Sequence, residues 1–441
     1  MKKIVVIGAG VSGLSIARLL VDGGNKVTVI EKEDKPGGLI KCDNINGCLY
    51  HKVGGHVFNT KRKDVLEWFE SIFDKEKDFS KADRNSVVSM PDRRLINYPV
   101  ENHAYQFTPV LLDEFIDNLQ GMIKNGDTKG EPTNFAEFLY FRFGAMLYRE
   151  YFQPYNEKIW KRDLTTVPLS WLEGKLPMPT LKEILYNNFI HLEEKNFVHS
   201  TFFYPRYGGS QFLANKLAEE LDIRYNTQVV SLEKRNECWL VNNDCFDQVI
   251  FCGNIKDLPV LLNNVVDISS FESMIEKLEY HGTTSVFCEI EKNPYSWIYL
   301  PSREYQAHRI ICTGNFSEAN NTPGVLTGVV EFTDHISKED ILKNLEKIPF
   351  SPRYLTHTYT KYTYPIQDTL TREMILNLKN ILEKQGLYLL GRFAEWEYYN
   401  MDAAMGAAID MFNSKLKNKV LDYVKDVSFE SDIRKMPLGL K

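Results

Sequence analysis

Long hydrophobic runs are missing from this chain of 441 residues. No stretch approaches the ~20 consecutive apolar residues of a membrane-spanning helix, and the N-terminus has a strand pattern, not that of a signal peptide. An excess of basic charge is missing too, because 53 Lys and Arg residues stand against 59 Asp and Glu residues, for a net charge of −6. We therefore expect neither insertion into a membrane nor binding to nucleic acid.

Cysteine is scarce and shows no pattern. The seven cysteines are scattered along the chain, and none forms a Cys-x-x-Cys pair. This arrangement predicts neither a zinc site nor a disulfide framework, and no metal is expected. Internal repeats are absent as well. We expect a protein of the reducing cytoplasm, whose length predicts two or three subdomains instead of one core.

A glycine-rich motif directly follows the first apolar run. Residues 4–7 have a strand pattern, a helical pattern follows the glycines, and a second apolar strand ends on Glu31. The motif between strand and helix is Gly8-Ala9-Gly10-Val11-Ser12-Gly13. Gly8 permits a tight turn, Gly10 lets the backbone approach a pyrophosphate, and Gly13 lets the helix pack close to the strand. The helix N-terminus would hold the pyrophosphate, and Glu31 would accept a hydrogen bond from a ribose hydroxyl, which predicts a dinucleotide-binding unit.

The residues after Glu31 distinguish between dinucleotides. Lys32 opens a short loop that leads to Gly37-Gly38-Leu39. Such a Gly-Gly resembles the FAD-binding motif of flavoproteins of the glutathione-reductase and amine-oxidase type, which ordinary nicotinamide dehydrogenases lack. Near the C-terminus an apolar strand, 387–390, ends in Gly391-Arg392, and a helix of small residues follows at 403–409. FAD is therefore favoured over NAD.

The remaining pattern predicts two insertions into this unit. We expect a helix over 64–72, a hairpin over 87–99, a helical region from 109 to 192, strands at 228–232, 239–241 and 247–252, and a β-rich region over 278–332 with a strand at 324–330. The predicted fold class is α/β: a discontinuous Rossmann-like FAD-binding domain with a helical insertion and an antiparallel β-sheet substrate domain. The FAD-binding domain is expected over 1–75, 200–265 and 375–441, the helical domain over 105–195, and the β-sheet domain over 76–104 and 266–374. A substrate would lie in the crevice between the insertions and the FAD.

Several further segments together resemble the UDP-galactopyranose mutase family over nearly the whole chain. They are, in order, Val53-Gly54-Gly55-His56-Val57-Phe58, Asn97-Tyr98-Pro99-Val100-Glu101-Asn102, Gln153-Pro154-Tyr155-Asn156-Glu157-Lys158-Ile159-Trp160, Phe203-Tyr204-Pro205-Arg206-Tyr207-Gly208-Gly209, Tyr364-Pro365, and Gly391-Arg392-Phe393-Ala394-Glu395-Trp396-Glu397-Tyr398. The resemblance implies an isomerase that interconverts the pyranose and furanose forms of a nucleotide sugar, foremost UDP-galactose. It also implies that reduced FAD forms a covalent bond from its N5 to the sugar, with UDP leaving and returning.

The resemblance further implies roles for individual residues. Arg309, His56 and Arg392 would be catalytic: Arg309 would bridge the diphosphate and the sugar, His56 would contact the flavin edge, and Arg392 would support the reduced flavin. Cofactor binding would involve Gly8, Gly10, Ser12, Gly13, Glu31, Lys32, Gly38, Leu39, His56, Val230, Arg392, Met401 and Asp402. Substrate binding would involve Tyr155, Asn156, Trp160, Lys175, Arg309, Tyr364 and Tyr398. The partners would be the nucleotide sugar and a flavin reductant, either NAD(P)H or a reductase, and a homodimer is possible.

Three departures from the family pattern leave the substrate open, and one is His199, which stands where the eukaryotic-type branch has an asparagine. Lys175 stands where the family has a phosphate-contacting arginine, which keeps the charge but loses the planar fork, and Glu101 replaces a glutamine. UDP-N-acetylgalactosamine or a dTDP-6-deoxyhexose would suit this chain as well as UDP-galactose. The main alternative activity is that of a flavin amine oxidase or desaturase of the same fold. A third is that of a non-enzymatic FAD-fold sensor or binding protein.

Overall fold

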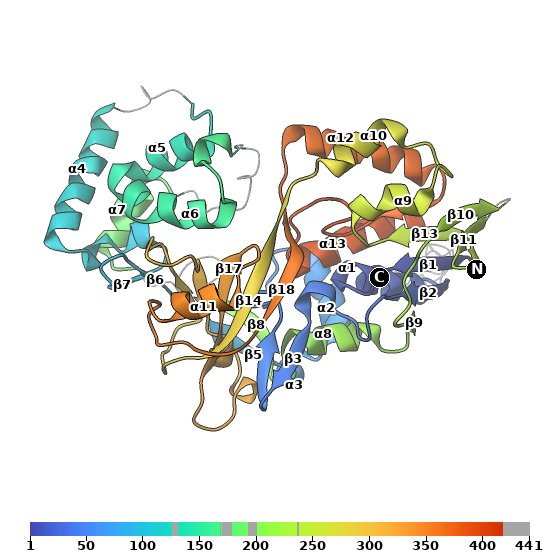
Figure 1. The fold of residues 1–441 in the computed structure, drawn as a ribbon, viewed down its shortest axis with the longest axis horizontal. Helices are drawn as coiled ribbons and strands as arrows, with labels where there is room; N and C mark the ends of the chain where they lie inside the picture. The colour runs from blue at the N-terminus through green and yellow to red at the C-terminus, as the bar shows by residue number, and fades with distance from the viewer. Residues whose placement is uncertain (126–130, 168, 170–178, 193–200, 236–237, 418–441) are drawn as a thin grey trace, which may run out of the picture.

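A five-stranded parallel sheet forms the centre of the part drawn on the right in Figure 1. The computed structural model describes residues 1–125, 131–167, 169, 179–192, 201–235 and 238–417. The strand order is β19 (Leu387–Leu389), β13 (Gln248–Phe251), β1 (Lys3–Ile7), β2 (Lys26–Ile30) and β9 (Asp222–Arg224), and each neighbouring pair is parallel. Strands from both ends of the chain therefore build one sheet around β1.

Side-chain alternation along β1 divides the core into two layers. Ile4 and Val6 pack into one buried cluster, and Val5 and Ile7 pack into another. The first cluster is covered by α1 (Val11–Asp22), α2 (Lys63–Ile72), α8 (Gly209–Ala218) and α13 (Met401–Met411). The second is covered by α9 (Leu258–Leu262), α10 (Ser269–Glu276), α12 (Thr369–Glu383) and the antiparallel strands β10 (Leu232–Arg235), β11 (Cys238–Val241) and β12 (Asp244–Phe246). Both faces are covered, as a parallel sheet requires.

A seven-stranded sheet makes up the second part of the molecule. Its order is β18 (Arg353–Pro365), β14 (Tyr280–Glu289), β17 (Thr327–Thr333), β16 (Arg309–Ile311), β15 (Trp297–Tyr299), β6 (Ser86–Ser89) and β7 (Leu95–Asn97). The long strands β14 and β18 run through the middle of the molecule, and α11 (Lys338–Leu345) lies beside them (Figure 1). The pairs are antiparallel except β15 with β6, which is parallel. The predicted α/β class is confirmed, with this one parallel pair as a departure from a purely antiparallel sheet.

The expected helical region forms a separate group of helices, at the upper left of Figure 1. It contains α4 (Pro109–Asn125), α5 (Phe135–Leu147), α6 (Gln153–Trp160) and α7 (Leu181–Phe189), with a π-helical turn at Tyr148–Phe152. The Asn134 side chain caps α5 by accepting a hydrogen bond from the amide of Glu137 at 3.0 Å. Two short antiparallel ribbons complete the fold. One pairs β3 (Cys42–Ile45) with β4 (Cys48–His51), and the other pairs β5 (Phe79–Asp83) with β8 (Thr201–Pro205). The helix α3 (Lys75–Asp78) directly precedes β5.

Two predicted strands are misplaced. The strand expected at 228–232 begins only at Leu232, because the side chain of Asn242 takes the backbone hydrogen bonds at Gln228 and Val230 that a neighbouring strand would have made. The strand expected at 324–330 lies at Thr327–Thr333, because Gly324 occupies a turn with φ of +86°. Both errors arise from turn geometry that apolar alternation does not reveal.

The expected absence of disulfides is wrong at one pair. Cys238 and Cys245 form a disulfide across the β11–β12 hairpin, where Leu240 lies opposite Cys245 and the two cysteine Cα atoms are 5.9 Å apart. Hairpin pairing brings these cysteines together, and their spacing alone did not indicate it. The other five cysteines are free.

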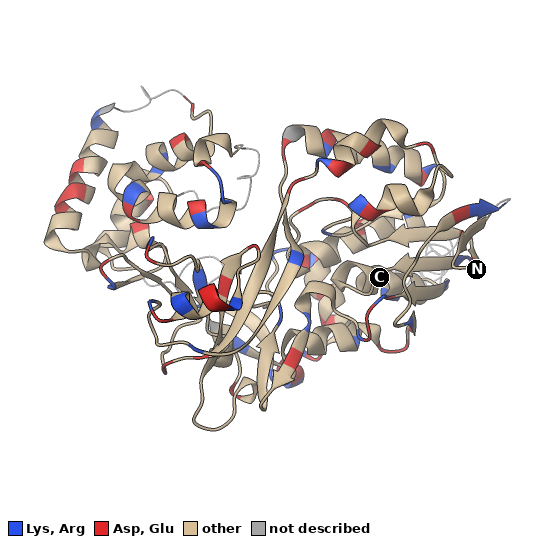
Figure 2. Cartoon of the chain, in the orientation of Figure 1, with Lys and Arg blue, Asp and Glu red and all other residues tan. Residues whose placement is uncertain are grey.

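Charges of both signs are mixed along the part of the chain that the structure describes. Figure 2 shows Lys and Arg interspersed with Asp and Glu over the helices and connecting segments. None of the helices that the structure describes is both long and apolar enough to span a bilayer.

Candidate functional site

The glycine-rich turn between β1 and α1 has the geometry of a nucleotide cradle. Gly8 has φ of +105°, and a Cβ on Gly13 would lie 1.9 Å from the carbonyl oxygen of Gly8, so the helix packs directly against the turn. A Cβ on Gly10 would meet nothing within 4 Å, whereas one on Gly38 would lie 3.3 Å from the Cα of Gly10. The space over Gly10 is therefore open and bordered by the turn that contains Gly38.

Two helix N-termini are available to an anion at this cradle. The N-cap residues are Gly10 for α1 and Asn400 for α13, and neither makes a side-chain capping hydrogen bond. The two helices pack against each other, so Met401 and Asp402 in the first turn of α13 lie on a helix beside α1. A Cβ on Gly391 would lie 2.9 Å from the Oγ of Ser12, so the end of β19 also approaches α1 closely. Unpaired amides at such termini favour phosphate oxygens, and these residues fit a dinucleotide.

Glu31 is buried at the end of β2 with a fixed carboxylate. Its Oε2 accepts a hydrogen bond from the amide of Ala9 at 2.7 Å, and its Oε1 accepts one from the amide of Glu33 at 3.0 Å. Each oxygen keeps a lone pair for a ribose hydroxyl. Lys32 and Val230 are exposed, and the amide of Val230 donates to Asn242 at 3.3 Å.

His56 is fixed against the second glycine turn. Its Nε2 lies 3.1 Å from the carbonyl oxygen of Leu39, and because a carbonyl only accepts, Nε2 carries the hydrogen. Burial, together with the positive charge of Arg392, lowers the pKa of His56 to about 4. His56 is therefore neutral at pH 7.

A buried carboxylate, Glu331, fixes the predicted catalytic arginine. Arg309 on β16 lies opposite Glu331 on β17, and its Nε donates to Oε2 of that carboxylate. Oε1 of Glu331 accepts from the amide of Gly54 at 3.0 Å, and the Nε2 of His308 lies 3.5 Å from Oε2. Burial alone would raise the pKa of Glu331, but Arg309 and His308 lower it to about 2. No sequence motif indicates Glu331, although a lone carboxylate in an apolar strand could have indicated it.

Burial would lower the pKa of Arg309, but the adjacent Glu331 carboxylate raises it well above its usual value. Arg309 is therefore a permanent cation with only 22% of its side chain exposed. Glu331 joins it to the Gly54-Gly55-His56 loop, so the β-sheet and the cofactor cradle meet at one hydrogen-bonded carboxylate.

Two predicted tyrosines extend the site from Arg309 to Arg392. The Nη2 of Arg309 donates to the hydroxyl of Tyr364 at 3.2 Å, and Tyr364 stacks on Tyr398 with ring centroids 5.7 Å apart. The guanidinium of Arg392 lies 4.2 Å from the centroid of Tyr398 and is held by the carbonyls of Thr363 and Tyr399. Burial raises the pKa of Tyr364 to about 12, so its hydroxyl keeps its proton. Two cations and two phenols thus lie together, as recognition of an anion requires.

The residues predicted on α6 divide into two groups. Tyr155 lies toward the β-sheet, with its ring 5.6 Å from Tyr299 and 6.5 Å from His308. Trp160 lies in the core of the helical group, edge-on to Phe135, and is 4% exposed. The side-chain amide of Asn156 donates to the carbonyl of Phe152 in the π-helical turn that precedes α6. Their contacts with substrate stay predictions, and Lys175 lies outside the described residues.

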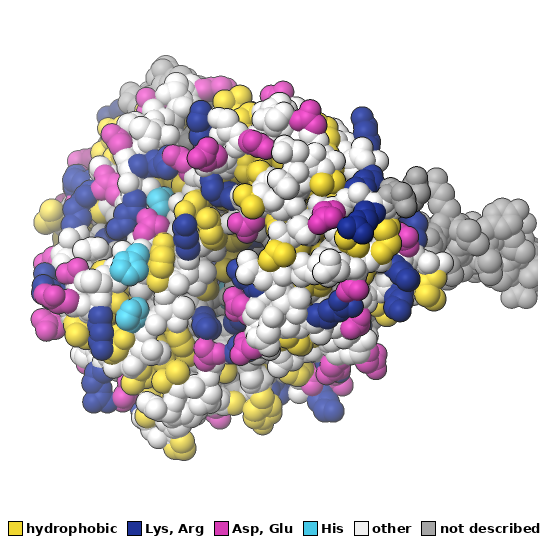
Figure 3. All heavy atoms as spheres, turned by 45° about the vertical axis from the view of Figure 1, so that its right-hand side comes forward, with side chains coloured by type: hydrophobic (Ala, Val, Ile, Leu, Met, Phe, Trp, Pro, Cys, Tyr) yellow, Lys and Arg dark blue, Asp and Glu magenta, His cyan; other side chains and the backbone are white. Residues whose placement is uncertain are grey.

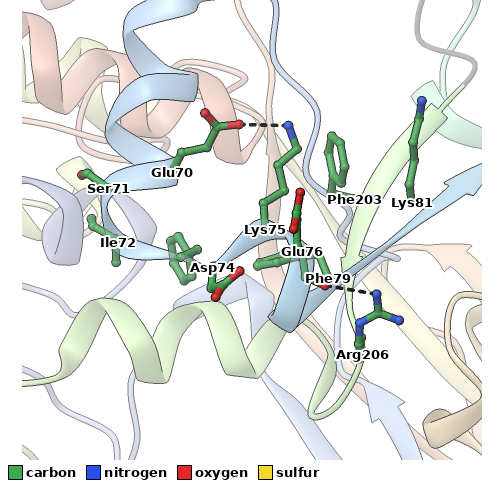
Figure 4. Close-up of a pocket in the computed structure, with 11 residues that line it drawn as sticks. Glu70, Ser71, Ile72, Asp74, Lys75, Glu76, Phe79, Lys81, Phe203 and Arg206 are labelled. Atoms are coloured by element: carbon green, nitrogen blue, oxygen red, sulfur yellow. Dashed lines mark hydrogen bonds and ion pairs between the residues drawn. The ribbon is translucent and has the colours of Figure 1, made fainter.

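The surface is hollowed between the two halves of the molecule. Figure 3 shows a recess between the part at the left and the part at the right, with Lys and Arg side chains at its margin. A second hollow of about 900 Å³ lies elsewhere, where α2, α3, β5 and the end of β8 meet (Figure 4). Two of the three cations that line it are engaged: Lys75 pairs with Glu70 at 2.9 Å, and Arg206 donates to the carbonyl of Glu76. Among the described residues, no group of three His, Cys, Asp or Glu could hold a metal.

Comparisons with known proteins agree with this geometry. Residues 6–72 match the family model of the NAD(P)-binding Rossmann-like domain. The chain is 22% identical to the UDP-galactopyranose mutase of Mycoplasma genitalium, over 91% of this chain and 92% of that protein. It is 23% identical to the dTDP-fucopyranose mutase of Escherichia coli, over 95% of this chain and 99% of that protein.

A crystal structure of reduced UDP-galactopyranose mutase superposes with a TM-score of 0.81 at 20% identity, covering 95% of this chain and 97% of that one. A putrescine oxidase superposes with a TM-score of 0.62 at 14% identity, over 93% and 99% of the two chains. The matched family model agrees with the dinucleotide-binding unit predicted at the N-terminus. The resemblance expected from the motifs is confirmed: this chain is similar to UDP-galactopyranose mutases over nearly its whole length.

Proposed function

We propose that this protein interconverts the pyranose and furanose forms of a nucleotide sugar, most simply UDP-galactopyranose and UDP-galactofuranose, on reduced FAD. The observation that carries the proposal is the group formed by Arg309, Tyr364, Tyr398 and Arg392, which Glu331 joins to the loop containing His56. A cationic, phenol-lined site suits a diphosphate, whereas an amine substrate would meet the repulsion of two guanidinium groups.

Gly8, Gly10 and Glu31 would hold the FAD, which in its reduced form would supply the nucleophile for the anomeric carbon of the sugar. The protein's part is to stabilise the charge that leaves. Arg309 would hold the diphosphate, and Tyr364, which already accepts a hydrogen bond from Arg309, keeps its own hydrogen for a phosphate oxygen. Negative charge grows on that oxygen as the bond breaks, so these contacts strengthen in the transition state.

The remaining groups would orient the two reactants. Glu331 holds Arg309 in one position, so little side-chain motion is lost when substrate binds. Arg392, packed over Tyr398, would supply positive charge to a reduced, anionic flavin. Neutral His56 adds no charge there and holds the second glycine turn through Leu39.

The experiment is a substrate panel on dithionite-reduced protein. UDP-galactose, UDP-N-acetylgalactosamine and dTDP-fucose would each be incubated with the reduced holoprotein, and the products would be separated by HPLC and weighed by mass spectrometry. A product of unchanged mass and new retention time supports the proposal. Hydrogen peroxide release with an amine substrate, and no isomer from any nucleotide sugar, would establish the oxidase alternative.

A second nucleotide sugar has specific support. The dTDP-fucopyranose mutase of Escherichia coli aligns with 95% of this chain, at 23% identity. We therefore include a dTDP-6-deoxyhexose as the second candidate substrate. The ratio of kcat/KM between UDP-galactose and dTDP-fucose decides between them.

A further inference from the structure

A buried polar cluster without a charged group lies below the second glycine turn. It comprises His51 at the end of β4, Tyr204 on β8, Ser210 in the first turn of α8, and Asn320 in the 3-10 helix η11 (Glu318–Asn320). All four residues have no solvent exposure. Polar groups this deep are costly unless hydrogen-bonded, and these are bonded to one another.

The donors and acceptors allow only one direction along the cluster. The amide nitrogen of Asn320 donates to the Tyr204 hydroxyl at 2.9 Å, and its orientation is fixed because it also donates to the carbonyl of Thr313. The hydrogen of Tyr204 is then free to go to the Nε2 of His51 at 2.7 Å. Burial lowers the pKa of His51 to about 3, so the ring is neutral and carries its one hydrogen on Nδ1.

The chain of hydrogen bonds continues to the glycine turn. The Nδ1 of His51 lies 3.4 Å from the Oγ of Ser210, and that hydroxyl donates to the carbonyl of Ile40 at 2.8 Å. A carbonyl has no proton to pass on, so the chain ends there and cannot carry protons to the site. Its effect is to fix the position of the carbonyl of Ile40.

Ile40 closes the 3-10 turn η1 (Gly38–Ile40), which borders the cofactor cradle. Gly38 in this turn approaches Gly10, and the carbonyl of Leu39 accepts the hydrogen bond from His56. The turn is therefore held from both sides, by Ser210 from below and by His56 from the side of the site.

We propose that Tyr204, His51 and Ser210 are positioning residues for the flavin, which act by holding the turn Gly38–Ile40 in the shape that the cofactor needs, with His51 as the Nδ1–H tautomer. The proposal depends on flavin binding alone and not on the sugar chemistry. A failure of the mutase assay would therefore leave it standing.

The test compares Tyr204→Phe with a matched control, Tyr50→Phe. Tyr50 precedes His51 on the same strand, is 2% exposed, and donates to the carbonyl of Ser285 at 2.7 Å, away from the turn. Tyr204→Phe loses two buried hydrogen bonds at the phenol oxygen and Tyr50→Phe loses one, so both should unfold at a lowered temperature, Tyr204→Phe at the lower one. Only Tyr204→Phe should also raise the dissociation constant of FAD from the refilled apoprotein, by about 3- to 10-fold, the usual effect of one hydrogen bond.

The tautomer provides a second readout. In ¹⁵N spectra of the holoprotein, His51 should show a protonated Nδ1 and a bare Nε2, and Tyr204→Phe should give a mixture of tautomers. If Tyr204→Phe does not fold, Ser210→Ala takes its place, because it removes the bond to Ile40 and should raise the FAD dissociation constant similarly. Equal FAD affinity in the test and control variants, or a wild-type His51 protonated on Nε2, would overturn the proposal.

Discussion

At the scale of single residues, the ion pair between Arg309 and Glu331 sets the charge of the site. The register of β16 and β17 places the two side chains opposite each other, and burial makes the pair insensitive to solvent. Motif resemblance indicated Arg309 and Tyr364, which lie 55 positions apart and are in contact. It could not indicate Glu331, because that contact depends on strand register, which a motif does not encode.

Arg309→Ala should be the most damaging single loss of charge. Removing one preorganised donor costs ~3 kcal/mol of barrier, or about a hundredfold in kcat/KM. The matched control is Arg303→Ala, whose arginine is 63% exposed and pairs with Glu157 at the surface, and which should retain wild-type kinetics. Arg309 does not contact the diphosphate if its alanine variant stays within about threefold of wild type with normal flavin content, far short of the expected loss.

Glu101 predicts a pH-dependent stability. It lies in the 3-10 helix η2 (Val100–Asn102), is 4% exposed, and has no cationic partner among the described residues. Burial raises the pKa of its carboxyl to about 7. The folded state then binds a proton that the unfolded state releases near pH 4.5, so stability falls as pH rises from 4.5 through 7, by about 3 kcal/mol in total.

Glu101→Gln removes this titration while keeping the shape of the side chain. Its melting temperature should exceed that of wild type at pH 8, and the difference should shrink toward pH 5, where the native carboxyl is protonated. Differential scanning calorimetry across this range measures it. A difference independent of pH would mean that Glu101 is paired in solution.

At the scale of elements, the β1–α1 unit was the best predicted part of the chain. The order of its glycines determines its geometry locally, and the structure reproduces it. The segment before β10 was the worst predicted, because its valines suggest a strand while the side chain of Asn242 bonds the backbone of Gln228 and Val230. The β5–β8 ribbon was not predicted at all, since it pairs Phe79 with Pro205 across more than a hundred residues.

Gly10 and Gly13, the second and third glycines of the first motif, should respond differently to substitution. Gly10→Val should leave the apoprotein folded, because a side chain there enters open space, but should abolish flavin binding by filling the place of the pyrophosphate. Gly13→Val should destabilise the fold itself by roughly 1–3 kcal/mol or more, because its Cβ would collide with the carbonyl of Gly8. Melting temperature of the apoprotein and flavin absorbance separate the two effects. Full flavin occupancy in Gly10→Val would refute the proposed position of the cofactor.

At the scale of the whole molecule, two folded parts meet at the site. The parallel sheet supplies the cradle, and the seven-stranded sheet supplies Arg309, Glu331 and Tyr364. The domain boundaries predicted from sequence stay predictions, although the class of fold is confirmed. The motifs and the apolar pattern predicted this fold class. They could not predict how the two parts contact each other, because that depends on packing between distant segments.

Turnover should require reduced flavin and yet consume no reductant. An isomerisation involves no net oxidation or reduction, so one reduction with dithionite should support many turnovers under argon. Product formation and flavin absorbance, followed together, measure this. Sustained turnover by the fully oxidised protein, or peroxide formed in proportion to product, would contradict it.

The order of the strands along the chain also affects how the parallel sheet forms during synthesis. β1 is synthesised first, but its partner β13 follows some 240 residues later and β19 later still. Such distant pairings carry a loop-closure cost and slow folding. While the ribosome works, one edge of β1 stays open, and an open edge can pair with another chain. A cofactor held between β1 and α1 would therefore meet a sheet that is completed only when most of the chain has been made.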